Sequence, residues 1–384
     1  MMKSFIDKFT RFYGTAPTAA AMAPGRLEIL GNHTDYNQGF VLSCAVAQNT
    51  AFALKRTDGT VCTLHDFRSG KTMEFDLANL DDVPPNGSRY VKGMVKELSK
   101  RGFEVTAFDA AIESTVPLSA GMSSSAALET AAGYAIGKEF GITLDKAEWA
   151  RCGQGVENNY LGLKSGLLDQ FSSIFGKKES MILSDFRTVE VLRTAALPSG
   201  YAIVVINSMK KHNLVDSEYN VRRADCEAAA KVMNSIVPRA TTLRDISLEQ
   251  LNAAKDKMSD REFRRALHVV GECTRVMEGI KLLDEGNVAG FGNLWFESHF
   301  SSRDNFENST PELDYLVELA QTVPGCLGAR LSGGGFGGIT IHLVEADAAQ
   351  EYAKRVSTAY ENKTGVAAES IICNIGDGAK LIEF

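Results

Sequence analysis

Residues 117–127 have the sequence PLSAGMSSSAA and lead directly into an alanine-rich segment that continues to Phe140. Ser123 stands at the start of that segment and Gly141 follows it, and these residue types commonly begin and end an α-helix. We therefore predict a helix over residues 123–140. A flexible loop that enters a helix presents unpaired backbone N–H groups and the positive end of the helix dipole, so this segment predicts a site for the phosphates of a nucleotide. The structural alternative is a plain serine cap.

A second polar segment lies near the N-terminus, where residues 24–39 have the sequence PGRLEILGNHTDYNQG. Arg26, His33 and Asp35 stand close together between glycines, which allow sharp backbone turns. We expect a loop that places a cation and several hydrogen-bonding groups on one small polar ligand. The alternative is a surface turn with an ion pair that is only structural.

A third segment, residues 328–338, has the sequence GARLSGGGFGG and precedes an expected strand at residues 339–344. So many glycines indicate either unusual backbone angles or the close approach of another backbone or a ligand. Because a strand follows the glycines, the dinucleotide-binding fingerprint, which needs a strand and then a helix, does not apply. The alternative is a flexible hairpin loop.

The pattern of elements predicts an α+β protein of two domains with a cleft between them. A chain of 384 residues is too long for one ordinary core. We place the boundary at the turn near residues 197–200, so that residues 1–197 carry the first two segments and residues 198–384 carry the glycine-rich one. Besides a short N-terminal helix and a strand pair around residues 181–192, we expect strands at residues 41–46, 50–54, 61–65, 107–112, 201–206, 339–344 and 370–373, and helices at residues 90–101, 146–160, 217–232, 248–258, 260–284 and 288–300.

Composition excludes several classes of function. The chain is 44% hydrophobic and 23% charged, as soluble globular proteins are. Its net charge of -7 provides no basic field for nucleic acid or an anionic membrane. The seven cysteines form no CxxC pair, so we expect reduced thiols and no zinc site. No segment predicts a signal peptide or a membrane helix, and the expected location is the cytoplasm.

The three segments, in this order and spacing, resemble the three motifs of the GHMP small-molecule kinases, and residues 24–39 are similar to the galactokinase signature. The resemblance covers nearly the whole chain. It implies an ATP-dependent sugar 1-kinase, most of all a galactokinase that converts galactose and ATP to galactose 1-phosphate and ADP, and a monomer is slightly favoured. Other stretches that look like galactokinases are SGLLDQF at residues 165–171, SEYNVRR at residues 217–223, HVV at residues 268–270 and ESH at residues 297–299.

The same resemblance implies the roles of individual residues. Asp169 would be the catalytic base, with Arg26 beside it to stabilise charge. Glu157 and the hydroxyl of Ser124 or Ser125 would bind Mg²⁺, which prefers oxygen ligands. The structural alternatives are an ion pair for Asp169 and an exposed helix charge for Glu157. The sugar pocket would contain Asn32, His33, Asp35, Gly166 and Tyr219, of which Tyr219 could instead be a core aromatic residue; the ATP phosphates would lie against Ser119, Ala120, Gly121, Met122, Ser123, Ser124, Ser125, Gly334 and Gly335.

Five residues depart from the family pattern, among them Ser119, Ser332 and Ile339. The other two lie in the segment of residues 24–39. Galactokinases have glutamate where this chain has Asn32, and asparagine where it has Glu28. An uncharged residue near C6 of the sugar would tolerate a uronic acid better than a glutamate does, because two close carboxylates repel. Galacturonate, arabinose and an N-acetylhexosamine are therefore alternative substrates. A non-catalytic sugar sensor is less favoured because the serine loop is intact, and so is a GHMP kinase for mevalonate or homoserine.

Overall fold

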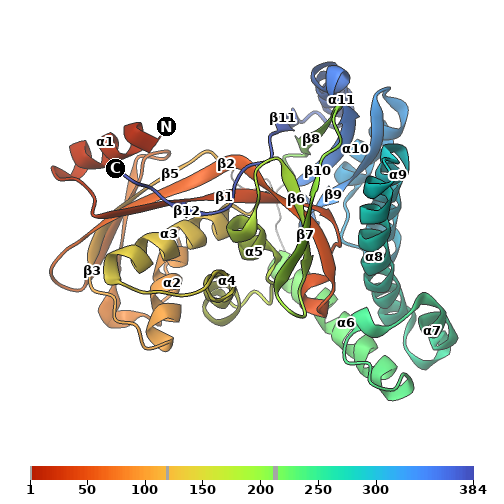
Figure 1. Cartoon of the computed structure of the whole chain (residues 1–384), viewed down its shortest axis with the longest axis horizontal. Coiled ribbons are helices and arrows are strands. Elements are labelled where there is room, and N and C mark those ends of the chain that lie inside the picture. Colours follow the sequence, from red (N-terminus) through yellow and green to blue (C-terminus); the bar gives the residue numbers. More distant parts are fainter. Residues whose placement is uncertain (1, 118–120, 211–214) are drawn as a thin grey trace.

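The computed structural model describes residues 2–117, 121–210 and 215–384. It contains two β-sheets, one built mainly from the N-terminal half of the chain and one from the C-terminal half, each covered by its own helices (Figure 1). The prediction of an α+β fold is confirmed. Within the described residues, no helix has both the length and the apolar character that are needed to cross a membrane.

The first sheet is built around the long strands β1 (Ala19–Leu30) and β2 (Phe40–Arg56), which pair antiparallel along most of their length. The other edge of β2 pairs with β6 in its first part and with β5 in its second part. The strand order is β12-β1-β2-β5-β3-β4, with β7 added to β6. Among the strands that the structure describes here, only β3 and β5 pair in parallel. The remaining strands are β3 (Val61–Asp66), β4 (Lys71–Asp76), β5 (Phe108–Ser114), β6 (Ser180–Asp185), β7 (Glu190–Ala196) and β12 (Lys380–Leu381).

Successive side chains of β1 face opposite layers, as the pleat of a strand requires. Ala19 and Ala21 belong to the core that the sheet forms with four helices, whereas Ala20 faces α1 (Met2–Tyr13), whose Phe5 is buried against it. The four helices lie on one face of the sheet and α1 lies on the other (Figure 1). They are α2 (Ser88–Lys100), α3 (Ser124–Phe140), α4 (Lys146–Gly155) and α5 (Leu168–Phe175).

The second sheet is antiparallel, with the order β11-β8-β10-β9. Val204 and Ile206 of β8 pack against α10 and α11, whereas Ile203 and Val205 face a core that includes α8 and α9. The elements of this half are β8 (Tyr201–Asn207), β9 (Cys326–Ser332), β10 (Ile339–Glu345), β11 (Glu369–Cys373), α6 (Val215–Ile236), α7 (Leu248–Ala253), α8 (Asp260–Asp284), α9 (Val288–Ser301), α10 (Pro311–Thr322) and α11 (Ala349–Thr364).

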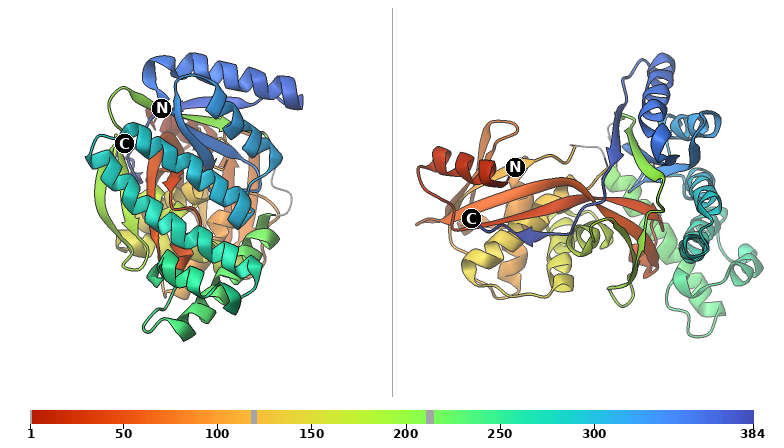
Figure 2. Two further views of the ribbon diagram at one scale, coloured as in Figure 1. Left: turned by 90° about the vertical axis from the view of Figure 1, so that its right-hand side faces the viewer. Right: turned by 45° about the horizontal axis from the view of Figure 1, so that its top comes forward.

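One hydrophobic core joins the two halves. Leu27 and Ile29 of β1 are buried in the same cluster as Ile341 of β10 and Trp295 of α9. In the left view of Figure 2, α8 and α9 lie in front of the ends of β1 and β2. The far end of β1 therefore lies between the halves, and its polar side chains line the cleft described below.

The predicted boundary near residue 197 falls between β7 and β8, which belong to different sheets. The last strand, β12, returns to the first sheet and pairs with β1. The division into residues 1–197 and 198–384 stays a prediction.

The expectation of a loop over residues 24–39 is wrong for its first part, because residues 24–30 belong to β1. Pro24 and Gly25 suggest a turn, yet they stand at a register shift between β1 and β2, where a strand tolerates such residues. A Cβ on Gly25 would lie 2.6 Å from the carbonyl oxygen of Met122, so the glycine allows a close backbone approach.

Four further expectations need correction. The helix expected over residues 248–258 ends at Ala253 and is followed by a separate 3₁₀ turn, Lys255–Lys257. Residues 328–332 are not loop but the end of β9, where glycine at 328 lets the strand touch α9. The two strands expected at residues 41–46 and 50–54 are parts of the single strand β2. The helix expected over residues 146–160 ends at Gly155 and continues as a π-helical turn, Val156–Leu161.

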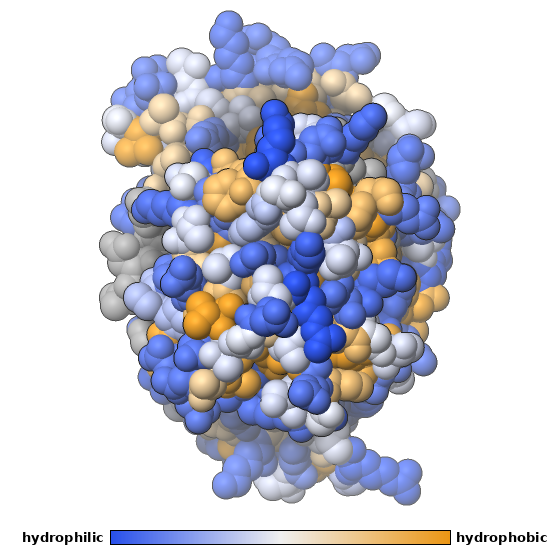
Figure 3. Space-filling view, turned by 90° about the vertical axis from the view of Figure 1, so that its left-hand side faces the viewer, coloured by the Kyte–Doolittle hydropathy of each residue, from blue (hydrophilic) through white to orange (hydrophobic). Residues whose placement is uncertain are grey.

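The end of the molecule that carries α1 shows apolar side chains interspersed with polar ones (Figure 3). Phe12 is among its exposed apolar residues, and its ring stacks on His65 with a centroid distance of 3.9 Å. This stacking fixes α1 on the sheet at its C-terminal end.

Candidate active site

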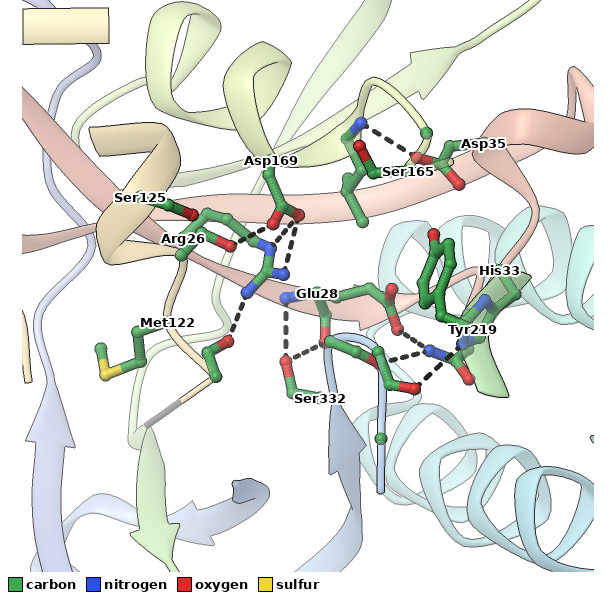
Figure 4. Close-up of a pocket in the computed structure, with 18 of the residues that line it drawn as sticks. Arg26, Glu28, His33, Asp35, Met122, Ser125, Ser165, Asp169, Tyr219 and Ser332 are labelled. Atoms are coloured by element: carbon green, nitrogen blue, oxygen red, sulfur yellow. Dashed lines mark hydrogen bonds and ion pairs between the residues drawn. The ribbon is translucent and has the colours of Figure 1, made fainter. Parts of the chain in front are cut away.

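Arg26 and Asp169 meet at the wall of a cleft that both halves of the chain line (Figure 4). Arg26 extends from β1, and Asp169 stands in the first turn of α5. The guanidinium donates from Nε and Nη2 to Oδ1 of Asp169, at 2.8 and 2.7 Å, and from Nη1 to the carbonyl oxygen of Gly121 at 2.6 Å. The Asp169 side chain is 29% exposed and that of Arg26 only 5%. The guanidinium is therefore buried in the protein, whereas the carboxylate stays open to the cleft.

Ser123 holds the second carboxylate oxygen of Asp169 with its hydroxyl group. Its backbone is left-handed, with φ of 54°, immediately before α3 begins. No side chain in the described part of the chain caps this helix, and Ser124 and Ser125 of its first turn line the cleft. Uncapped N–H groups and the helix dipole attract anions, so the geometry at this end of α3 suits a phosphate group.

Glu157 lines the same cleft from the π-helical turn that follows α4. The hydroxyl of Ser165 donates a hydrogen bond to its Oε2. Burial, together with the negative charge of Asp169, raises the pKa of Glu157 to about 7. A carboxyl group that is half protonated near neutral pH becomes fully charged when a cation binds beside it. Glu157 can therefore serve as a cation ligand.

Asp35 and Gly166 form another part of the wall. Asp35 accepts hydrogen bonds from the backbone N–H groups of Tyr36 at 2.9 Å and Leu168 at 3.0 Å. Burial raises the pKa of its carboxyl group. A Cβ on Gly166 would lie 1.8 Å from Oδ2 of Asp35, so only glycine fits at this position. The loop before α5 therefore packs closely against the turn after β1.

His33 belongs to an aromatic cluster beside Asp35. Its Nε2 donates to the carbonyl oxygen of Gly334 at 3.1 Å, because a carbonyl only accepts, and its Nδ1 accepts from the Tyr36 hydroxyl at 2.9 Å. Burial lowers the pKa of His33 to about 4, so the ring is neutral near pH 7. The Tyr219 ring lies 5.0 Å from it, centroid to centroid. Tyr219 lines the cleft and is only partly buried, so it belongs to the cleft wall and not to the core.

Asn32 and Glu28 both line the cleft and form a hydrogen-bonded pair. Figure 4 shows Glu28 at the wall of the cleft. Asn32 is fully buried, and its Nδ2 donates to Oε1 of Glu28 and to the carbonyl oxygen of Gly333, both at 2.8 Å. Its Oδ1 accepts from Asn308 at 3.0 Å. Oε1 of Glu28 also accepts from Arg330 at 2.8 Å. The pair is thus anchored to the second half of the chain.

The glycine loop after β9 closes the cleft from the second half. Gly335 has φ of 80°, and a Cβ there would lie 2.2 Å from the carbonyl oxygen of Asn308. The carbonyl oxygen of Gly334 bonds to His33, as described above, and to Nδ2 of Asn308 at 3.2 Å. The glycines therefore permit both a positive φ and a close backbone approach, as the sequence predicts.

The cleft has a volume of about 260 Å³. All predicted site residues that the structure describes line it, whereas Ser119 and Ala120 lie outside the described residues. Their individual roles stay predictions. The residues brought together are Arg26, Asn32, His33, Asp35, Gly121, Met122, Ser123, Ser124, Ser125, Glu157, Gly166, Asp169, Tyr219, Gly334 and Gly335.

Comparisons with known proteins agree with this geometry. Residues 7–56 match the galactokinase galactose-binding signature, residues 89–177 the N-terminal domain of GHMP kinases, and residues 280–362 their C-terminal domain. A galactokinase from Roseiflexus sp. (strain RS-1) is 37% identical over 97% of this chain and 95% of its own length. The chain belongs to the galactokinase family.

Two more similar proteins support this assignment. A galactokinase from Actinobacillus pleuropneumoniae serotype 3 (strain JL03) is 38% identical over 98% of both chains. The crystal structure of Lactococcus lactis galactokinase complexed with galactose has a TM-score of 0.92 and 32% identity and covers 99% of both chains. The predicted GHMP kinase fold is confirmed, and the chain is an ATP-dependent sugar kinase of the galactokinase family.

Sequence reasoning missed some of the residues that line the cleft of this galactokinase-family chain. From the sequence, Glu28 is only a departure from the family pattern. It stands two residues after Arg26 on β1, however, so both side chains point to the same face of the strand. Recognising residues 24–30 as a strand would have placed Glu28 in the site. The other lining residues without a predicted role are Leu163, Ser165, Leu168, Ser332, Gly333 and Gly337.

Proposed function

We propose that the protein transfers the γ-phosphoryl group of ATP to the anomeric hydroxyl of galactose. The observation that carries this proposal is the position of Asp169, whose two carboxylate oxygens contact Arg26 and Ser123. These contacts put one carboxylate where the wall formed by β1 meets the end of α3 that suits a phosphate. The structure of the Lactococcus lactis relative with galactose supports galactose as the sugar.

Asp169 would act as the general base. The anomeric oxygen attacks the γ-phosphorus, the bond from that phosphorus to the oxygen bridging the β- and γ-phosphates breaks, and ADP leaves with the electron pair. The proton of the sugar hydroxyl passes to the Asp169 carboxylate. Because phosphoryl transfer depends mainly on positioning and charge stabilisation, this proton can leave late in the reaction. Arg26 would stabilise the negative charge on the oxygens of the moving group.

The nucleotide phosphates would lie at the N-terminal end of α3. The backbone N–H groups of its first turn and the hydroxyls of Ser124 and Ser125 can donate to phosphate oxygens. Gly121 and Met122 line the approach to this turn. Of the two glycines that we expected at the phosphates, Gly334 accepts a hydrogen bond from His33, which favours a place at the sugar end of the cleft.

The end of the cleft at α3, where the phosphates would lie, fits a magnesium ion. Glu157 and the two serine hydroxyls supply hard oxygen ligands, and the described residues contain no group of three or more histidine, cysteine or acidic side chains that could hold a metal ion. Mg²⁺ suits such a sparse set, because it keeps several waters and takes further ligands from the phosphates of its nucleotide. When bound, the ion would neutralise charge on the β- and γ-phosphates.

The sugar would lie between the turn after β1 and α6. Asp35 can accept hydrogen bonds from sugar hydroxyls. Its carboxylate occupies the space that a side chain at Gly166 would fill. The neutral His33 and the Tyr219 ring provide a wall of fixed shape beside it. Three acidic side chains, Asp35, Glu28 and Glu157, line the cleft in addition to Asp169, and the first two lie at its sugar end. A cleft with this charge favours a neutral sugar over a uronic acid.

A coupled assay of ADP formation with Mg²⁺ tests the proposed function. The sugars are galactose, galacturonate, arabinose, glucose and N-acetylgalactosamine, and the Asp169→Asn variant is the control for the base. We expect the highest kcat/KM for galactose and a large loss in the variant. A higher kcat/KM for another sugar would overturn galactose as the substrate. Sugar binding without turnover would favour a sensor.

A further inference from the structure

The side chain of Asn32 has no hydrogen-bonding capacity left for a ligand. An amide offers two N–H donors and an acceptor oxygen with two lone pairs. Both donors are used, on Glu28 and Gly333, and the oxygen accepts from Asn308 at 3.0 Å and from Ser302 at 3.4 Å. Asn32 is also fully buried. Its side chain therefore acts within the protein, although it lies at the cleft.

Glu28 differs from Asn32 because its two carboxylate oxygens are used unequally. Oε1 accepts from both Asn32 and Arg330, each at 2.8 Å. Oε2 has no hydrogen-bond partner among the described residues. It is not one of the fully buried polar atoms that lack a partner, so it is open to the cavity that Glu28 lines. The close-up shows the Glu28 carboxylate at the wall of the cleft, on the side of Tyr219 (Figure 4). A charged side chain with 2% exposure thus presents one free acceptor to the cavity.

The surroundings of Glu28 hold this acceptor in place. Arg330 is fully buried, so it requires a negative partner, and it also donates to the carbonyl oxygen of Ile29 at 2.8 Å. The backbone of Glu28 is fixed as well, since its N–H and its carbonyl oxygen both bond to the hydroxyl of Ser332 at 3.0 Å. A carboxylate with so little freedom can bond a hydroxyl at one position only.

We propose that Oε2 of Glu28 accepts a hydrogen bond from one hydroxyl of the sugar, and that Asn32 and Arg330 are positioning residues which aim it. This inference rests on the proposed function, because it takes galactose as the ligand. Glu28 then determines specificity in two ways. A buried acceptor rejects a sugar that lacks the matching hydroxyl, since the carboxylate is left unpaired. It also repels a carboxylate at that position.

A cycle of variants and deoxy sugars tests the role of Glu28. The kcat/KM of the full-length protein is measured for galactose and for galactose analogues that lack the hydroxyl at C2, C3, C4 or C6. The same series is then measured with Glu28→Gln, which keeps the size and the contact to Arg330 but removes the charge. For each analogue, the ratio of galactose to analogue is compared between the wild type and the variant, because this comparison cancels any intrinsic effect of the missing hydroxyl on reactivity.

We expect the wild-type kcat/KM to be about 10- to 100-fold lower for at least one analogue than for galactose. This is the effect of losing one hydrogen bond to a charged group. In Glu28→Gln that ratio should fall several-fold for one analogue alone, while the other ratios stay unchanged. A merely structural Glu28 would lower all rates together and leave every ratio as it is, which would overturn the proposal. If Glu28→Gln does not fold, Glu28→Asp, which keeps the charge for Arg330 but withdraws the acceptor, gives the same test.

The two proposals fail in different ways. Absence of galactose turnover in the wild-type protein would overturn the proposed function and this inference with it. Turnover of galactose with identical ratios in wild type and variant would overturn only the assignment of Glu28.

Discussion

Nδ2 of Asn32 lies 2.8 Å from Oε1 of Glu28, across the turn that ends β1. The galactokinase pattern has the carboxylate and the amide at these two positions in the opposite order. The direct hydrogen bond between them indicates that the exchange keeps one amide–carboxylate pair and does not remove a charge from the site. Asn32 therefore gives no support to a uronic acid as the substrate, because Glu28 retains a carboxylate at the cleft.

Replacing the proposed base should reduce catalysis without preventing binding. Asp169→Asn keeps an oxygen that can accept from Arg26 but cannot take the proton. We expect kcat to fall by about 10²- to 10⁴-fold, the usual contribution of a positioned base. The coupled assay measures kcat, and calorimetry with galactose and with ADP checks that both still bind. A variant that keeps a third or more of the wild-type kcat would contradict the role of Asp169.

A single methyl group at Gly166 should damage the sugar site. In Gly166→Ala the Cβ would lie 1.8 Å from Oδ2 of Asp35, so the carboxylate or the loop must move. We expect KM for galactose to rise by about tenfold or more, the effect of losing roughly one hydrogen bond to a charged group. KM for ATP should change little.

Gly87→Ala is the matched control for this substitution. Gly87 stands before α2 with a negative φ, and only the sulfur of Met73 lies near the added Cβ, at 3.8 Å. The control should keep the wild-type KM for galactose. Equal values of KM in the two variants would show that the contact between Gly166 and Asp35 does not matter for the sugar.

Binding of Mg²⁺ with ADP should release protons near neutral pH. Burial and Asp169 raise the pKa of Glu157 to about 7, so about half of the molecules carry a proton there at pH 7. A ligand carboxylate must be charged, so binding expels this proton. Calorimetry in buffers of different ionisation enthalpy measures the number of protons released. We expect the part that Glu157 contributes to decrease as pH rises above its pKa. Glu157→Gln should remove this part and leave only the protons that the phosphates of ADP release.

Glu129 should be neutral in the folded protein. It is fully buried on α3, its only hydrogen bond among the described residues is from Nε2 of Gln170 at 2.9 Å, and burial holds its pKa well above the ordinary value. Because the folded state binds a proton that the unfolded state loses above about pH 4.5, stability falls as pH rises toward the folded pKa. The isosteric Glu129→Gln should remove this slope from urea unfolding curves.

Glu129→Ala is the contrasting variant. It leaves a cavity and an unpaired amide on Gln170, so we expect it to lower the free energy of unfolding by about 2–4 kcal/mol. Glu129→Gln should stay within about 1 kcal/mol of the wild type near pH 7. A large destabilisation by Glu129→Gln alone would mean that the charged carboxylate is needed.

The glycine- and serine-rich segments predicted part of this cleft because such segments have direct physical meanings. The start of α3 is one example, since a serine before an alanine-rich run marks a helix end that can hold phosphate. The sequence also predicted α8, whose bounds Asp260–Asp284 match the expected helix. Such segments carry their structure in local residue preferences. Asp169, Glu157, Gly166 and Tyr219 were expected only from the resemblance to galactokinases.

What the sequence could not predict depends on contacts between distant residues. Pro24 and Gly25 suggest a turn, and only pairing with β2 makes their segment a strand. The bonds of Asn32 to Gly333 and Asn308 join residues that are far apart in the chain. From the sequence alone, Asn32 was therefore a sugar ligand and Glu28 only a departure from the family pattern.

Phosphorus–proton correlation NMR of the reaction mixture tests the central claim most directly. Wild-type protein with Mg²⁺, ATP and galactose should give a sugar phosphate whose phosphorus couples to the anomeric proton, and Asp169→Asn should give almost none. No product, or a phosphate on another carbon of galactose, would contradict the claim that this cleft phosphorylates the anomeric hydroxyl of galactose.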